Sequence, residues 1–449
     1  MKQKWLGLAA ILIGMSASAL MQTMIAATMP TITADIGGLS LYSWVFSGYM
    51  LASTVTIPLF GRLADLFGRR ILYVTGLLVF LLGAALVGAA QRMDLLVAYR
   101  IVQGIGAGAV APAALAAIGD LFGDKERGKV FGFIGAAQVI ANLIGPPLGG
   151  WIADAYSWRL NFWLVLPVGG LAALLALVSL PNQRWQPAPA VPAPPGGRRR
   201  QALESAPDER PAEVLAAEIP SAPNSCSGSR PLRRTLAAFS APRLAAPAFW
   251  QPAAGAFLLG LATASAVAYF PLYLQQLFAF TAAATGLALL PMLLMAGVAS
   301  AAGGWLTARA PRPTQAAAWA LIASGFCLLA LLRPQNIGPL AALIGAGMGL
   351  LLPVYLHTAQ EAGGEAFRAT ASGLIQMARN LGGALGIPLL GVWLAGGEPK
   401  PAFSALFASL ALVGVCGLIL GAVAPGARSA PHSSAGAGDA VRLENSLPH

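Results

Sequence analysis

Long apolar stretches alternate with short polar interruptions along most of the chain. Twelve stretches have roughly the 20 apolar residues that a helix needs to cross a bilayer. They lie near residues 5–28, 42–60, 71–90, 93–119, 130–154, 160–180, 249–278, 282–307, 314–332, 337–359, 369–395 and 402–424. Because the runs are continuous rather than alternating, they exclude a transmembrane barrel and favour helices. The pattern predicts an all-α integral membrane protein with about 12 transmembrane helices in two six-helix bundles.

The segment between the two groups of apolar runs has a different composition. Residues 181–247 contain thirteen prolines and mixed charge, so they cannot bury enough apolar area to fold alone. Residues 427–449 are similarly polar. We therefore expect an N-terminal bundle over residues 1–180, a disordered cytoplasmic linker over 181–247, a C-terminal bundle over 248–426 and a disordered cytoplasmic tail over 427–449.

Composition supports a membrane protein and argues against other classes. The chain is 57% hydrophobic and only 10% charged, whereas a soluble domain carries about 25% charged residues. The net charge of +11 does not indicate nucleic acid, because Lys and Arg lie almost wholly between the apolar runs. The three cysteines are widely separated and form neither a disulfide framework nor a metal-binding spacing. We expect no cofactor, no metal and no catalytic residue.

The positions of the loop cations orient the chain in the membrane. If both termini are cytoplasmic, the inner segments hold eleven Lys and Arg, and the outer loops hold only Arg92, Arg159, Arg333 and Lys400. Since cytoplasmic loops carry the excess of positive charge, we expect both termini and the linker to be cytoplasmic.

The stretch "GRLADLFGRR" separates the second and third apolar runs. Gly61 permits a tight exit from the second helix, Gly68 permits a second bend, and Asp65 can pair with an arginine on either side. By itself the stretch could equally be a solvated turn. Its spacing resembles the signature loop of the major facilitator superfamily. That resemblance implies a conformational switch that latches the two bundles, made of Gly61, Asp65, Gly68, Arg69 and Arg70.

The fourth run contains "RIVQGIGAGA", which starts with an arginine at membrane depth. A charge there is costly, so Arg100 is a candidate functional residue. Gln103 and Gly104 follow on the same helix face, and Gly104 with Gly108 allows a neighbouring helix to approach closely. Alternatively, Arg100 extends to an interface near Asp94. The pattern resembles the fourth-helix motif of the superfamily, which implies a role in proton coupling for Arg100, Gln103 and Gly104.

The fifth run contains "ANLIGPPLGG". Pro146 and Pro147 remove backbone donors and bend the helix, while Gly145 and Gly149 provide a flat face for packing. A simple kink would explain the prolines equally well. The stretch resembles the antiporter motif, which occurs in exporters of the superfamily and is usually absent from its importers. The residues that carry this resemblance are Gly145, Pro146, Gly149 and Gly150.

Several polar and aromatic side chains interrupt otherwise apolar helices. On the predicted fifth helix two of them are one turn apart, and on the eleventh three form an i, i+3, i+4 stripe around Arg379. Each could merely bond to a neighbouring helix, but for the Arg379 stripe we favour a cavity. The predicted substrate cavity comprises Gln138, Asn142, Tyr269, Tyr273, Tyr355, Gln376, Arg379 and Asn380.

Further segments extend the resemblance over nearly all of the apolar chain. "TMPTITADIGG", "WRLNFW", "FPLYLQQ", "GLALLP" and "ASGLIQMARNLGGALGI" are similar to multidrug exporters of the drug:proton antiporter group. This implies a monomeric, proton-coupled antiporter in the bacterial cytoplasmic membrane that exports amphiphilic small molecules by alternating access. One alternative is a metabolite or vitamin permease, against which the fifth-helix motif argues. Another is a membrane enzyme or sensor, but no nucleophile cluster, metal set or phosphate loop appears.

The first apolar run departs from this resemblance. Relatives carry an acid in the phrase Leu-Asp-x-Thr, whereas this chain reads "LMQT" with Met21 in the acidic position. No Asp or Glu lies in the middle of a predicted helix, so the sequence does not identify the group that would bind a proton. Arg100 and Arg379 give the interior a positive bias. We therefore expect neutral, zwitterionic or weakly anionic amphiphiles to be exported better than permanent cations.

Overall fold

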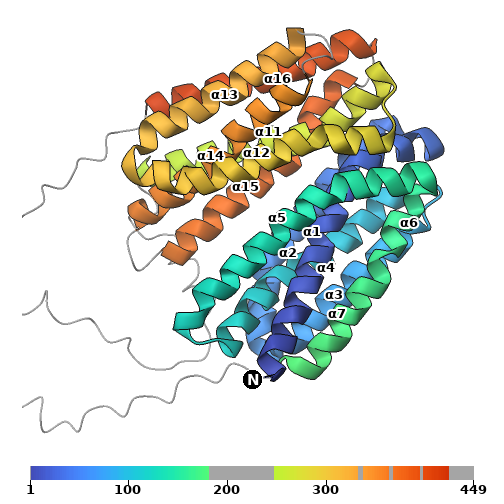
Figure 1. The fold of residues 1–449 in the computed structure, drawn as a ribbon, viewed down its shortest axis with the longest axis vertical. Coiled ribbons are helices and arrows are strands. Elements are labelled where there is room, and N and C mark those ends of the chain that lie inside the picture. Colours follow the sequence, from blue (N-terminus) through green and yellow to red (C-terminus); the bar gives the residue numbers. More distant parts are fainter. Residues whose placement is uncertain (1, 182–246, 332–336, 364–367, 395–397, 424–449) are drawn as a thin grey trace, which may run out of the picture.

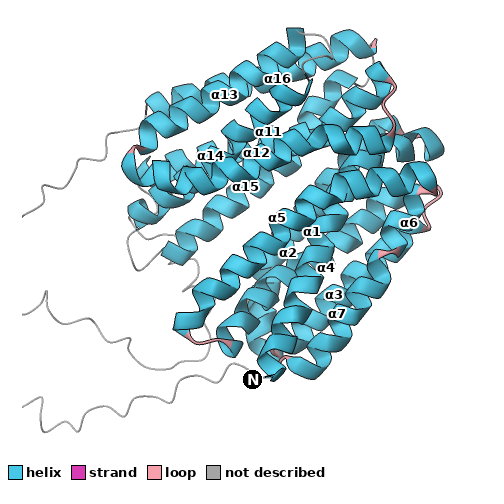
Figure 2. Cartoon of the chain, in the orientation of Figure 1, coloured by secondary structure: helices cyan, strands magenta, loops and turns pink. Residues whose placement is uncertain are grey.

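The computed structural model describes residues 2–181, 247–331, 337–363, 368–394 and 398–423. Within these ranges the chain forms helices joined by turns, and it forms no strand (Figure 2). Apart from Pro181 and Pro247 at its edges, the predicted linker lies outside the described residues, and so does the predicted tail.

The first group of helices extends from the start of the chain to Ser179. Its members are α1 (Lys2–Ile36), the short 3-10 helix η1 (Leu39–Leu41), α2 (Tyr42–Phe67), α3 (Arg69–Gly88), α4 (Met93–Leu121), α5 (Asp124–Ala155), α6 (Trp158–Trp163) and α7 (Val165–Ser179). The predicted sixth helix is thus divided at Leu164. Pro167 has no N–H to donate to the carbonyl of Trp163, so the helical ladder is interrupted there. In this bundle α4 packs against α2 and α3, and α5 against α1.

The second group begins at Pro247. Its members are α11 (Pro247–Phe278), α12 (Ala282–Arg309), α13 (Pro311–Leu331), α14 (Ile337–Gly363), α15 (Arg368–Gly391), the 3-10 helix η4 (Val392–Leu394) and α16 (Pro399–Ala422). The closest pairs in this bundle are α12 with α14, α11 with α15, and α13 with α16.

Eleven spans in the described residues are long and apolar enough to cross a membrane, with α6 and α7 counted as one. The exception among the long helices is α15, whose apolar character is reduced by Gln376, Arg379 and Asn380. Its 24 residues would still extend about 36 Å, and it packs against both α11 and α2. The described chain thus has six long helical spans in each group. This confirms the predicted all-α membrane fold.

The turn between α2 and α3 is shorter than predicted. α2 continues past Gly61 to Phe67, and a Cβ atom on Gly61 would meet no other atom within 4 Å. The prediction that Gly61 ends the second helix is therefore wrong, because one glycine among good helix formers does not stop a helix. Gly68 alone makes the turn, with φ of +95°, which confirms the predicted bend. The side chain of Asp65 lies outside the description.

The two bundles are close together at one end and separate toward the other. We call the end at which α1 and α5 begin and α2 and α4 finish the N-terminal face. The end at which α1 and α5 finish and α12 begins is the opposite face. Figure 1 shows the two groups of helices meeting at the right-hand end, the opposite face, and diverging toward the left.

Candidate functional site

Arg100 on α4 is buried and held entirely within the first bundle. Its Nη1 donates to Oε1 of Gln103 at 2.6 Å, and its Nε donates to the carbonyl of Val45 at 3.3 Å. The guanidinium lies over the ring of Tyr49, 4.2 Å from the ring centroid. Arg100 therefore does not extend to an interface, and Asp94 pairs instead with Arg92 at 2.8 Å.

The charge of Arg100 has no carboxylate partner among the described residues. Its Nη2 and the amide nitrogen of Gln103 are buried without a hydrogen-bond partner. Gly104 brings α4 against α2, since a Cβ atom there would lie 2.5 Å from the carbonyl oxygen of Tyr49. This close approach places the Tyr49 ring against the guanidinium of Arg100.

The antiporter-like segment of α5 contacts different neighbours on two faces. Gly145 and Gly149 face α1, and a Cβ atom on Gly149 would lie 2.8 Å from Cβ of Met24. Pro146 and Gly150 face α12 in the second bundle. A Cβ atom on Gly150 would overlap the carbonyl of Ala282, and one on Gly286 would overlap the carbonyl of Pro146. The bundles therefore meet here backbone to backbone.

Asp154 lies one turn beyond Gly150 and extends the same contact. Its two carboxylate oxygens accept hydrogen bonds from the backbone N–H groups of Ala282, at 3.1 Å, and Ala283, at 2.8 Å. These are the first two residues of α12, so a carboxylate from the first bundle caps a helix of the second. The sequence placed Asp154 at a helix end, but it held no signal for this partner, which is distant along the chain.

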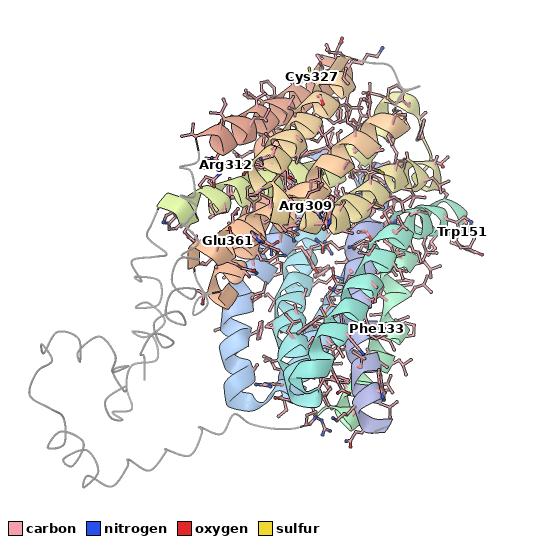
Figure 3. The ribbon with its side chains drawn as sticks, turned by 60° about the vertical axis from the view of Figure 1, so that its left-hand side comes forward. Phe133, Trp151, Arg309, Arg312, Cys327 and Glu361 are labelled. Carbon is pink, nitrogen blue, oxygen red and sulfur yellow. The ribbon has the colours of Figure 1, made fainter. Side chains whose placement is uncertain are left out.

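Further contacts join the bundles toward the opposite face. Gln275 of α11 donates to the carbonyl of Ala27 at 2.8 Å and accepts from the hydroxyl of Thr31 at 3.3 Å. The hydroxyl of Tyr42 donates to the carbonyl of Ala268 at 2.6 Å. In Figure 3, α5 passes from Phe133, away from the second bundle, to Trp151, where the bundles meet.

A mostly polar pocket of about 240 Å³ lies between the two bundles. Its lining residues come from α1, α4 and α5 of the first bundle and α15 of the second: Met15, Ser18, Ala19, Gln22, Ala107, Val110, Ala111, Gln138, Asn142 and Arg379. Three of these, Gln138, Asn142 and Arg379, are among the predicted cavity residues. Ser18 and Gln22 were not predicted, although their i, i+4 spacing in an apolar helix is the same kind of signal.

The other predicted cavity residues lie elsewhere. The ring of Tyr269 stacks on that of Tyr42, with centroids 5.9 Å apart. Tyr273 packs edge-on against Phe407 at 5.0 Å inside the second bundle, and the Tyr355 hydroxyl accepts from the indole N–H of Trp319 at 2.6 Å. Gln376 and Asn380 do not line the pocket, and Gln376 is exposed. These tyrosines contact neighbouring helices instead of the pocket, which spacing alone could not predict.

The predicted switch residues lie at the N-terminal face. Arg69, at the start of α3, forms an ion pair with Asp120 of α4 and donates to the carbonyl of Ala116 at 2.8 Å. Arg70 follows it and is half-buried. The expected pairing of Asp65 cannot be compared, since its side chain is outside the description. Asp120 was not predicted as a partner, because it comes from a different helix.

No group of His, Cys, Asp and Glu among the described residues has the arrangement of a metal site. What the geometry provides is a polar pocket between two bundles, with one face closed by backbone contacts and hydrogen bonds. Such an arrangement can bind a small molecule and can expose it on one side at a time.

Comparison with curated proteins identifies similar chains. Multidrug transporter protein MdtP of Bacillus subtilis is 30% identical over 408 residues, which cover 85% of this chain and 73% of that protein. Multidrug resistance protein 3 of the same organism is 40% identical over 162 residues, 36% of this chain and 32% of that relative. An uncharacterized MFS-type transporter of Mycobacterium tuberculosis is 29% identical, and the match spans 58% of its length.

The fold is also shared with a solved structure. A bacterial homolog of the human lysosomal transporter Spinster, in an inward-facing and unoccupied conformation, superposes with a TM-score of 0.68 at 14% identity, covering 94% of this chain and 95% of that one. Residues 11–387 match the Major Facilitator Superfamily. This match, the similarity to MdtP over most of both chains and the twelve-span fold show that the chain belongs to the major facilitator superfamily of multi-pass membrane transporters.

Proposed function

We propose that this chain exports amphiphilic small molecules from the cytoplasm by alternating access, as a proton-coupled antiporter. The observation that carries the proposal is the polar pocket between the bundles, lined by both of them. In the described conformation the bundles are joined at the opposite face. Exchanging these contacts for contacts at the N-terminal face would move the pocket's opening across the membrane.

The direction of transport is supported by two features. Two of the similar proteins are named a multidrug transporter and a multidrug resistance protein, and α5 carries the segment that resembles the antiporter motif.

The excess of loop cations at the N-terminal face supports a location in a bacterial cytoplasmic membrane with both termini inside. On this proposal the protein works as a monomer, since one chain provides both bundles and the whole pocket.

Proton coupling requires an acid or histidine that changes its protonation during the cycle. The described pocket lining contains none, so we place the coupling at helix ends. Asp35 at the end of α1 pairs with Arg159 at 2.8 Å. His357 and Glu361 on α14 lie 3.5 Å apart at the N-terminal face. These groups are the candidates for the titrating site.

The test is transport by purified protein in proteoliposomes with an imposed pH gradient. We expect a lipophilic fluorescent probe to accumulate in liposomes with an acidic interior and to be released by a protonophore. Gln138→Ala should reduce accumulation several-fold, whereas Gln376→Ala, outside the pocket on an exposed surface, should not. Uptake of a metabolite along the proton gradient, without movement of any amphiphile, would support the permease alternative instead.

A further inference from the structure

Among the described residues, Arg379 is the one charged residue that lines the pocket between the bundles. No described residue forms an ion pair with it, and its Nε is buried without a hydrogen-bond partner. Its backbone is fixed by close packing of α15 on α11, where the carbonyl of Arg379 abuts Gly260. The charge is therefore held at the pocket by the fold.

An unpaired guanidinium at membrane depth is costly and is normally compensated by an opposite charge. No acidic residue in the described part of the chain lines this pocket to compensate it. The bound molecule can do so, because a carboxylate accepts paired N–H bonds from a guanidinium with matching planar geometry. A cation in the same place would meet the positive charge, and no anionic side chain of the described lining would offset the repulsion.

The remaining polar lining also suits an anion. The side-chain amides of Gln22, Gln138 and Asn142 face the pocket, and no described residue forms a hydrogen bond with any of them. They supply N–H donors from the first bundle opposite the guanidinium from the second. With the Ser18 hydroxyl, they can surround the oxygens of a compact anionic group.

The size of the pocket limits what it can hold. Its volume of about 240 Å³ is below the roughly 300–1,000 Å³ of sites that enclose a drug-sized ligand. It therefore fits a head group, and the apolar lining side chains, such as Met15 and Val110, can contact the start of an attached hydrocarbon. We propose that Arg379, with Gln22, Gln138 and Asn142, binds the compact, singly charged anionic head of an amphiphilic substrate. This inference rests on the proposed export function and specifies its substrate class.

Binding measurements separate this inference from transport. The probes are a dansyl-labelled alkyl carboxylate, its methyl ester and the trimethylammonium analogue, titrated into the full-length protein in lipid nanodiscs, with empty nanodiscs subtracted. We expect the carboxylate to bind at least about tenfold more tightly than the ester, as a charge-assisted pair would give, and the ammonium probe to bind most weakly. Arg379→Gln should weaken carboxylate binding far more than ester binding and so reduce the carboxylate-to-ester ratio to about one, whereas Arg379→Lys should keep part of the preference.

The matched control is Arg92→Gln, which removes an exposed arginine far from the pocket and should retain the full carboxylate preference. If Arg379→Gln does not fold, Asn142→Leu tests the same site and should lower the preference about threefold, by removing one neutral donor.

Equal binding of carboxylate and ester by the wild type, or an undiminished ratio in the pocket variants, would overturn the anion site. Tight carboxylate binding without movement of any probe in proteoliposomes would refute export and leave the anion site standing. Export of the ester without any preference for the carboxylate in binding would support export and refute the anion site.

Discussion

Arg69 connects the turn after α2 to the end of α4 through its ion pair with Asp120. The two side chains are 25% and 19% exposed, so the pair is only partly screened by solvent. Both residues belong to the first bundle, and the described pair therefore holds α3 to α4 rather than joining the bundles. The pair therefore holds the Gly68 turn, and Arg69 and Arg70 that follow it, in place at the N-terminal face.

We expect Asp120→Asn to weaken the first bundle. A partly exposed ion pair of this kind contributes about 1 kcal/mol, so the apparent melting temperature of the purified protein should fall by about 2–4 °C, with a moderate loss of transport. Asp94→Asn removes a more exposed carboxylate, also paired with an arginine, and should change the melting temperature less. Equal melting of the wild type and the Asp120 variant would show that the pair adds no stability.

Residues on one helix were predictable from spacing, and partners on other helices were not. The i, i+3 relation of Arg100 and Gln103 correctly indicated that they lie on one face, where they are hydrogen-bonded. The ring of Tyr49 beneath Arg100 comes from α2, and no local pattern relates the two residues. The same limit applies to Arg69, whose observed partner lies 51 residues further along the chain.

α5 is the helix that joins the two bundles most directly. Its glycines at positions 145 and 149 pack against α1, while Pro146 and Gly150 contact α12 at the opposite face. Because the latter contact is backbone to backbone, it leaves no space for a side chain. Closure of the opposite face thus depends on position 150 remaining glycine.

We expect Gly150→Ala to fold but to disfavour closure of the opposite face. The added methyl group would overlap the carbonyl of Ala282, and overpacking of this kind costs about 1–3 kcal/mol, a shift of about fivefold or more. A Thr31→Cys reporter, placed at the bundle contact in a cysteine-free background, should then react faster with an impermeant maleimide, and transport should fall. Gly135→Ala, on the same helix with open space around it, is the matched control and should leave both unchanged. Identical labelling in the two variants would contradict the proposed closure contact.

The cap that Asp154 places on α12 makes a separate prediction. Asp154→Ala removes both hydrogen bonds to the start of α12, and loss of a capping group costs about 0.5–2 kcal/mol. We therefore expect the Thr31→Cys reporter to be labelled about two- to thirtyfold faster. Asp94→Ala removes a carboxylate that does not contact the second bundle and should have no effect. A labelling rate equal to the wild type would mean that the cap does not help to close this face.

The helices themselves were largely predictable, and their ends were not. Runs of apolar residues located each long helix, including α15, which is too polar to be among the eleven candidate spans. The continuation of α2 past Gly61 was missed, because a glycine in a polar stretch resembles a helix end when packing is not known. The division between α6 and α7 follows from Pro167, which lacks the N–H that would continue the helical ladder.

In the whole molecule, the two bundles are connected along the chain by residues 182–246, which lie outside the description. We expect deletion of about 40 residues between Gln186 and Ser229 to leave transport unchanged, since their composition offers no apolar core and enough chain remains to join the bundles. The measurement is probe export by the deletion variant, normalised to the amount of protein in the membrane. Loss of export at a normal amount of protein would indicate a specific role for this segment.

The six-plus-six arrangement was predictable at this scale because the composition of the linker separates two equal sets of apolar runs. The way in which the bundles meet was not predictable. Gln275 and Tyr42 show no feature in the sequence that marks them as cross-bundle donors. Only the placement of both bundles together identifies them.

The contact between α5 and α12 has a consequence for how the protein can evolve. The joint is made largely of main-chain atoms at Pro146, Gly150 and Gly286, whereas the pocket is made of side chains such as Gln22 and Gln138. A population selected on a new compound can therefore substitute residues around the pocket while the moving joint is inherited intact. Under such selection, adaptive substitutions should accumulate on the pocket-facing sides of α1, α4, α5 and α15, and glycine should persist at positions 150 and 286 in every surviving lineage.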